Sequence, residues 1–150
     1  GQAEAMQALC ADQAIPLALD EELIGLHSTE QRVHLLELIQ PAHIILKPGL
    51  LGGFGSVQKW ITLAEERQIG WWITSALESA VGLNAIAQWT ASLGVEISQG
   101  LGLGNLYTNN IPSPLEMKRD RLWHRPEKAC QRSGSYRPGT PWSARRRRFP

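Results

Sequence analysis

The sequence predicts an α/β fold in which helices cover a parallel sheet. Short apolar segments alternate along the chain with segments of helical period, and the links between them are short. The apolar segments lack polar alternation, as is typical of parallel strands buried on both faces. About four strands are found, which fits either a small doubly wound sheet or the second half of a (β/α) barrel.

The first two elements are a helix and a strand. Residues 2–11 have a helical period, and residues 15–21 (IPLALDE) form a short apolar run that ends in acids. The apolar side of the helix is expected to contain Ala5, Met6, Leu9 and Cys10. No strand precedes this helix.

The next pair is a capped helix and the strand 43–47 (HIILK). Ser28 or Thr29 can cap a helix that begins at Glu30 and ends at about Ile39. Its inward face is expected to contain Val33, Leu36 and Ile39.

Two further units follow. Ser56 is expected to begin a helix that ends near Gly70, before the strand 71–75 (WWITS). Residues 80–93 predict another helix, and residues 96–104 (EISQGLGLG) predict a last short strand that runs into a glycine loop. The last helix is expected to be apolar through Val81, Leu83, Ile86, Ala87 and Leu93.

Charge divides the chain at residue 124. Residues 1–124 hold 7 basic and 13 acidic side chains, whereas residues 125–150 hold 8 basic and 1 acidic. This basic tail contains no Leu, Ile, Val or Met, so it is predicted to be disordered. A shifted reading frame is one explanation for it, and an arm that binds nucleic acid is the other.

Other classes of protein are disfavoured. Cys10 and Cys130 form no disulfide or metal pattern, which fits a cytoplasmic setting. No apolar stretch is long enough to cross a membrane, and the histidines lack ligand spacing. The glycine loops do not match a phosphate-binding motif.

Polar residues follow the ends of the predicted strands. Because active sites of α/β folds form at the carboxyl ends of strands, these side chains are candidate site residues. In chain order they are Asp20, Glu21, Glu22, Lys47, Thr74, Ser75, Glu78 just beyond the third strand, Gly100, Gly102 and Gly104. The other interpretation is a lysine that extends into solvent and acids that precede a helix.

The motifs PLALDEELIG, IILKPGLLGGF, WWITSALESAVGLNAIAQW and QGLGLGNLYTNNIPSPLE stand in this order. Together they resemble the o-succinylbenzoate synthases of the enolase superfamily, in the version of Bacteroidetes-type bacteria. The resemblance covers about residues 1–124. It implies the C-terminal half of a (β/α)7β barrel.

The resemblance also implies a chemistry. The family dehydrates 2-succinyl-6-hydroxy-2,4-cyclohexadiene-1-carboxylate to 2-succinylbenzoate in menaquinone synthesis. It uses a divalent metal, usually Mg²⁺ with Mn²⁺ as another option, held by three carboxylates. Asp20 matches the third carboxylate, and Lys47 matches a catalytic lysine that faces the proton-abstracting lysine across the substrate. Thr74, Ser75 and Gly100 match positions near the succinyl group.

Elementary chemistry agrees with these roles. Removing a proton next to a carboxylate creates two negative oxygens, which a hard cation and an ammonium group stabilise. Burial and the adjacent metal are expected to lower the pKa of Lys47.

Parts of the family pattern are not found in these 150 residues. They are the first two metal carboxylates, the Lys-x-Lys pair with the base, and the capping domain. We therefore expect the chain to be inactive alone, to expose a sheet edge, and to need the N-terminal half of the enzyme as its partner.

Three other functions stay open at this point. A dipeptide epimerase usually carries Asp-x-Asp on the last strand, whereas QGLGLGNLYTNN contains no acid. A muconate-type cycloisomerase is a further option within the superfamily. From another class, the chain could be a non-catalytic binding module whose tail binds nucleic acid.

Overall fold

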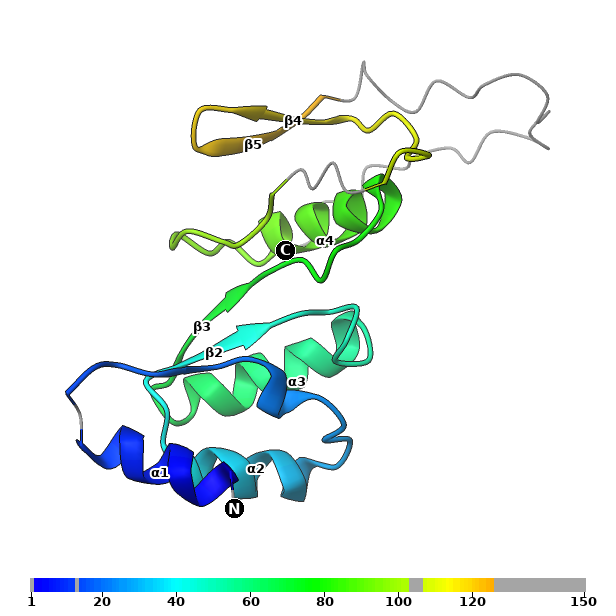
Figure 1. Ribbon diagram of the computed structural model, residues 1–150. Coiled ribbons are helices and arrows are strands. Elements are labelled where there is room, and N and C mark those ends of the chain that lie inside the picture. Colours follow the sequence, from blue (N-terminus) through cyan, green and yellow to red (C-terminus); the bar gives the residue numbers. More distant parts are fainter. Residues whose placement is uncertain (1, 13, 103–106, 126–150) are drawn as a thin grey trace.

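Three parallel strands form the sheet of this computed structural model, which describes residues 2–12, 14–102 and 107–125. The strands are β1 (Ala18–Leu19), β2 (His43–Leu46) and β3 (Gly70–Ile73). A helix connects each neighbouring pair: α2 (Thr29–Ile39) and then α3 (Phe54–Glu65) (Figure 1). The predicted alternation of strand and helix is therefore confirmed, although each strand is shorter than expected.

The strand order distinguishes the two predicted topologies. It runs β1-β2-β3 without the reversal that defines a doubly wound sheet. Thr74 donates its N–H to Leu46 on the β2 side, while Ile73 and Ser75 bond the backbone of Gly100 on the opposite side. The sheet thus continues in one direction, as the wall of a barrel does.

Of the fourth predicted strand, the structure shows only the backbone contact of Gly100 with β3 and Thr74 in the described residues. Over the described residues 96–102, an isolated parallel bridge between Gly100 and Thr74 replaces the predicted strand, so that prediction is wrong in extent there, and residues 103–104 lie outside the described residues. The side chain of Gln99 accepts the Ile73 N–H at 2.7 Å. A side chain therefore takes a donor that a longer backbone ladder would have used.

The helix ends follow from local chemistry. Ser28 caps α2 in a capping box: its hydroxyl accepts the Gln31 N–H, and the Gln31 side chain accepts the Ser28 N–H. Helix α3 begins at Phe54 instead of the predicted Ser56, because Gly53 adopts a φ of 87° at the N-cap.

The core lies between the sheet and its helices. Its largest fully buried side chains are Trp60, Leu19, Leu23, Leu36, Ile39, Ile44, Leu46, Ile73 and Val57. Helix α1 (Gln2–Asp12) packs against this core through Ala3, Met6 and Cys10. Leu9, predicted on that side, is 58% exposed, because the packed stripe runs through positions 3, 6 and 10 instead.

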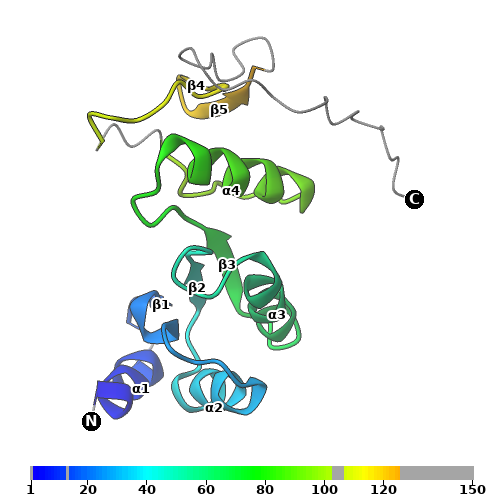
Figure 2. The same cartoon turned by 90° about the vertical axis from the view of Figure 1, so that its right-hand side faces the viewer.

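Helix α4 (Ala80–Ser92) lies beyond β3, and a hairpin follows it (Figure 2). Leu83 and Ile86 are buried as predicted, but Val81 at the start of the helix is exposed. The hairpin joins β4 (Leu115–Lys118) to β5 (Arg121–His124) in antiparallel register, and these two strands were not among the predicted elements.

The structure does not test the predictions about the basic tail. The basic tail lies outside the described residues except for Arg125, so its disorder, its origin and the boundary at 124 stay predictions. Over the described ranges, no helix is sufficiently long and apolar to span a bilayer.

We expect the isolated chain to self-associate. Among the described strands, β1 pairs only with β2, so its other edge offers unpaired backbone groups. Ile15 and Ile24, which flank this strand, are 71% and 43% exposed. Sedimentation velocity at rising concentration should show larger species. A cooperative melt with the same midpoint at every concentration would contradict this prediction.

Candidate active site

An ion pair joins the ends of the first two strands. Asp20 directly follows β1 and Lys47 directly follows β2. The Lys47 ammonium lies 2.8 Å from Asp20 Oδ2 and 3.7 Å from Glu21 Oε1. Its side chain is only 17% exposed, so the chain holds a largely desolvated cation at this edge of the sheet.

The electrostatics correct one expectation about Lys47. Its pKa is raised above the usual value because Asp20 accepts a hydrogen bond from the ammonium, and this effect outweighs desolvation. The predicted lowering was wrong for this chain, since it assumed a neighbouring cation, whereas the neighbours here are carboxylates. Lys47 is thus an ammonium ion at neutral pH.

Thr74, Ser75 and Gly100, which were expected near the succinyl group of the substrate, form a second group. Thr74 donates its hydroxyl to the Gly100 carbonyl at 2.8 Å, and the Ser75 N–H reaches the same carbonyl at 3.3 Å. A Cβ at Gly100 would lie 2.6 Å from the Thr74 hydroxyl, so only glycine fits there. The backbone contact between these segments therefore depends on a glycine.

The strand register places the two groups on one edge. Leu46 pairs with Ile73, so Lys47 and Thr74 each follow directly after the last pair of that ladder. Asp20 and Gly100 flank them at the ends of β1 and beyond β3. All five predicted site residues thus lie along what we call the rim, the carboxyl edge of the sheet.

Asp20 can serve as one ligand of a divalent cation, but a single carboxylate is not enough to form a metal site. Its Oδ1 is buried and has no hydrogen-bond partner in the described structure, so it can accept a cation while Oδ2 contacts Lys47. Mg²⁺ prefers several oxygen ligands in octahedral geometry. Over the described residues no group of three or more His, Cys, Asp or Glu side chains could hold a metal ion.

Sequence reasoning did not assign a role to two carboxylates on the rim. Glu21 contributes to the charge around Lys47, and the Glu78 side chain turns back to accept the Ala76 N–H at 2.5 Å. Glu78 Oε1 is buried without a partner in the described structure. The position of Glu78 just beyond a strand end was the available signal, but its burial depends on contacts distant in sequence.

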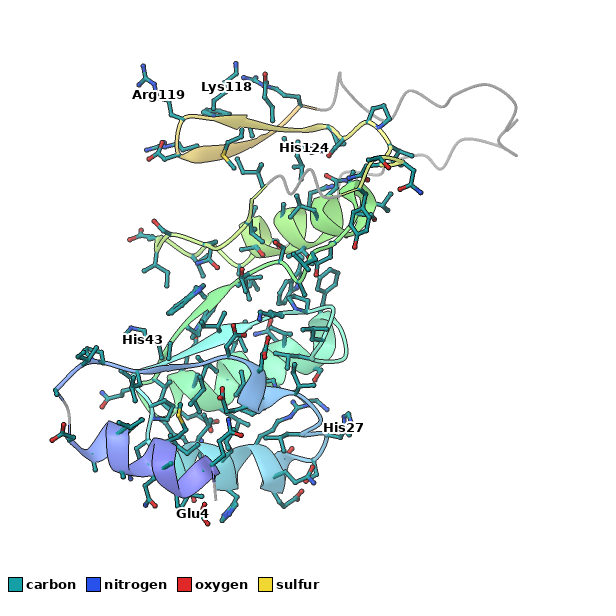
Figure 3. The ribbon with its side chains drawn as sticks, in the orientation of Figure 1. Glu4, His27, His43, Lys118, Arg119 and His124 are labelled. Carbon is teal, nitrogen blue, oxygen red and sulfur yellow. The ribbon has the colours of Figure 1, made fainter. Side chains whose placement is uncertain are left out.

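The labelled histidines lie apart from one another, and one large hollow lies away from the rim. Figure 3 shows His27, His43 and His124 on separate parts of the molecule. A hollow of about 650 Å³ lies at the opposite edge of the sheet, lined by residues such as Pro41 and Ile69 that precede β2 and β3. The five candidate site residues suggested by the sequence are not among the residues that line this hollow.

Comparison with known sequences gives one close relative. The chain is 62% identical over 110 residues to an o-succinylbenzoate synthase from Desulfotalea psychrophila. The match covers 73% of this chain and 30% of the relative, so the chain spans about a third of that protein's length. No family model matches the chain.

Solved structures give the same fold. The crystal structure of MenC from D. psychrophila has 58% identity and a TM-score of 0.78, over 81% of this chain and 34% of that one. An enolase-superfamily member from Listeria innocua has 20% identity and a TM-score of 0.65, over 81% and 33%. An N-succinyl Arg/Lys racemase from Bacillus cereus has 22% identity and a TM-score of 0.64, over 82% and 32%. These last two show a shared fold alone.

Proposed function

Because this chain is a C-terminal barrel segment of the enolase superfamily and corresponds to part of an o-succinylbenzoate synthase, we propose that it supplies one side of such an active site. The reaction would be the dehydration of 2-succinyl-6-hydroxy-2,4-cyclohexadiene-1-carboxylate to 2-succinylbenzoate in menaquinone synthesis. The supporting observation is the Lys47–Asp20 pair at 2.8 Å, on adjacent strand ends of a segment 62% identical to a synthase.

Lys47 is the catalytic residue of this segment in the proposal. Removing the proton next to the substrate carboxylate places negative charge on two oxygens. A preorganised ammonium group stabilises that charge without reorganising solvent. In the proposal Lys47 acts as this electrostatic partner, and the proton-abstracting base comes from another part of the enzyme.

Asp20 is the residue that would hold Mg²⁺, or Mn²⁺ in its place. Such an ion supplies Lewis-acid stabilisation of developing negative charge. Since one carboxylate is too few for this purpose, we propose that the other ligands and the base come from the N-terminal half of the enzyme.

Thr74, Ser75 and Gly100 complete the proposed site as substrate-binding residues. The hydroxyl of Thr74 is already directed to the Gly100 carbonyl, and the Ser75 N–H shares that carbonyl. This arrangement fixes the segment that would contact the succinyl end of a small carboxylate substrate. The proposal requires neither a membrane nor a nucleic acid, and it places the reaction in the cytoplasm.

A chimera tests the proposal. Residues 2–124 of this chain would replace the corresponding segment of the D. psychrophila o-succinylbenzoate synthase. The chimera is expected to form 2-succinylbenzoate with a requirement for Mg²⁺ or Mn²⁺, measured by the absorbance of the aromatic product. The isolated chain should show no turnover at any metal concentration.

Two results would contradict the proposal. A folded chimera that binds metal but forms no product would show that this segment cannot serve a synthase. Turnover by the isolated chain would show that its own residues complete the metal site. The same chimera should not epimerise a dipeptide. This assay tests the alternative that the segment belongs to a dipeptide epimerase.

A further inference from the structure

The loop between β3 and α4 is held by side-chain hydrogen bonds. It begins after Thr74 on the rim. Glu78 Oε2 accepts the Ala76 N–H at 2.5 Å, so this carboxylate closes the loop on itself. The Tyr107 hydroxyl donates to the Leu77 carbonyl at 2.7 Å, where Leu77 has a φ of 61°. A leucine in the left-handed region is strained, and these contacts offset that strain.

Glu78 also reaches the neighbouring turn of the rim, which follows Lys47. A Cβ built at Gly49 would lie 3.0 Å from Glu78 Oε1. Leaving aside Gly49 and its two chain neighbours, only the Glu78 carboxyl group lies within 4 Å of that Cβ among the described residues. Gly49 does not have a positive φ, so its backbone would accept an L residue. A side chain at position 49 would therefore require the Glu78 carboxylate to shift by a few tenths of an ångström.

A second glycine accommodates the stem of the same side chain. A Cβ at Gly82, in the first turn of α4, would lie 3.1 Å from Glu78 Cβ and 3.2 Å from Cγ. Glu78 is therefore packed between Gly49 on one segment and Gly82 on another. The three positions form a contact between the β2 end, the β3–α4 loop and the start of α4.

The chemistry of this contact indicates a purpose other than stability. A buried carboxylate oxygen without a partner costs free energy, and Glu78 Oε1 is such an oxygen in the described structure. An apolar side chain could fill the same space without a buried unpaired oxygen, although it would leave the Ala76 N–H without its acceptor. The carboxylate holds the turn after Lys47 and the β3–α4 loop at a fixed spacing. An apolar residue would not reproduce this spacing.

We propose that Glu78 is a positioning residue that locks the loop carrying Thr74 and Ser75 against the turn carrying Lys47. This inference rests on the proposed function. Lys47 would contact the reacting end of the substrate, and the loop would contact its succinyl end. Glu78 sets the separation between the two and thereby the orientation of the substrate.

The test uses Glu78→Ala, Gly49→Ala and the double variant in the chimera. Each is assayed with the full substrate and with an analogue that lacks the succinyl carboxylate. For the full substrate, Glu78→Ala should lower kcat/KM by about 100-fold, because small misplacements of bound groups have effects of this size. The analogue should lose less than about threefold, because it does not use the loop.

Gly49→Ala should cause a smaller loss of the same kind, because its methyl group shifts the Glu78 carboxylate by a few tenths of an ångström. The double variant should be no worse than Glu78→Ala, because removing the carboxylate vacates the space for that methyl group. The exposed Glu65 on α3 gives a matched control: Glu65→Ala should leave kcat/KM unchanged for both substrates. Glu78→Gln, which keeps an acceptor for the Ala76 N–H, replaces Glu78→Ala if the latter does not fold.

Equal losses for the two substrates would overturn the inference and assign Glu78 a purely structural role. Additive losses at positions 49 and 78 would overturn it as well. If the parent chimera forms no product, the proposed function fails, and the thermal midpoints of the same four proteins still test the contact. Non-additive midpoints then support the lock, and additive midpoints refute it.

Discussion

Replacing Lys47 by methionine in the chimera is expected to lower kcat by about 10²- to 10³-fold at saturating substrate and metal. Methionine keeps an unbranched chain but removes the ammonium that lies 2.8 Å from Asp20. The loss should appear in kcat because the ammonium acts on charge that develops during proton abstraction. Steady-state assays at several Mg²⁺ concentrations would measure it.

Two companion variants separate this role from alternatives. Lys59, an exposed lysine on α3, is the matched control, and Lys59→Met should have no effect on kcat. Asp20→Asn should instead raise the Mg²⁺ concentration required for activity, because it removes a charged metal ligand. If Lys47→Met lowers the thermal midpoint but leaves kcat within about threefold of the control, the lysine only pairs with Asp20 for stability.

Replacing Arg32 by methionine is expected to destabilise the barrel segment by about 3 kcal/mol. Arg32 is 4% exposed, and burial lowers its pKa. It donates to the Leu26 carbonyl at 3.1 Å, and to the Ser56 carbonyl and hydroxyl at 3.2 and 2.7 Å. Its guanidinium carbon also lies 5.2 Å from the centre of the Trp60 ring. The substitution would deprive half-buried acceptors on Leu26 and Ser56 of these donors.

Urea unfolding of the chimera would measure this loss. Arg67 provides the control because it pairs at 3.0 Å with Glu37, which is 62% exposed, and lies at the surface. Arg67→Met should cost less than about 1 kcal/mol, since exposed ion pairs contribute little. Equal unfolding midpoints for the two variants would show that the Arg32 contacts contribute no more than a surface pair.

Local patterns in the sequence determined the alternation of elements and the candidate site. Ser28, one of the two residues predicted as caps, is the N-cap of α2, and its capping box with Gln31 depends only on residues three apart. Asp20, Lys47 and Thr74 lie on one edge because parallel strands must present their carboxyl ends together. The resemblance added the family, which the comparison with the D. psychrophila synthase supports.

Only the tertiary structure decided which polar groups are buried and what surrounds them. Arg32 has the sequence context of a surface charge, yet it is buried, because Ser56 from the next helix supplies its acceptors. The pKa of Lys47 moved opposite to the prediction, because carboxylates surround the ammonium in this chain. The contact between Gly49 and Glu78 joins residues 29 positions apart, and no local period encodes it. Burial and electrostatics depend on groups that packing brings together, so they could not be predicted from neighbours along the chain.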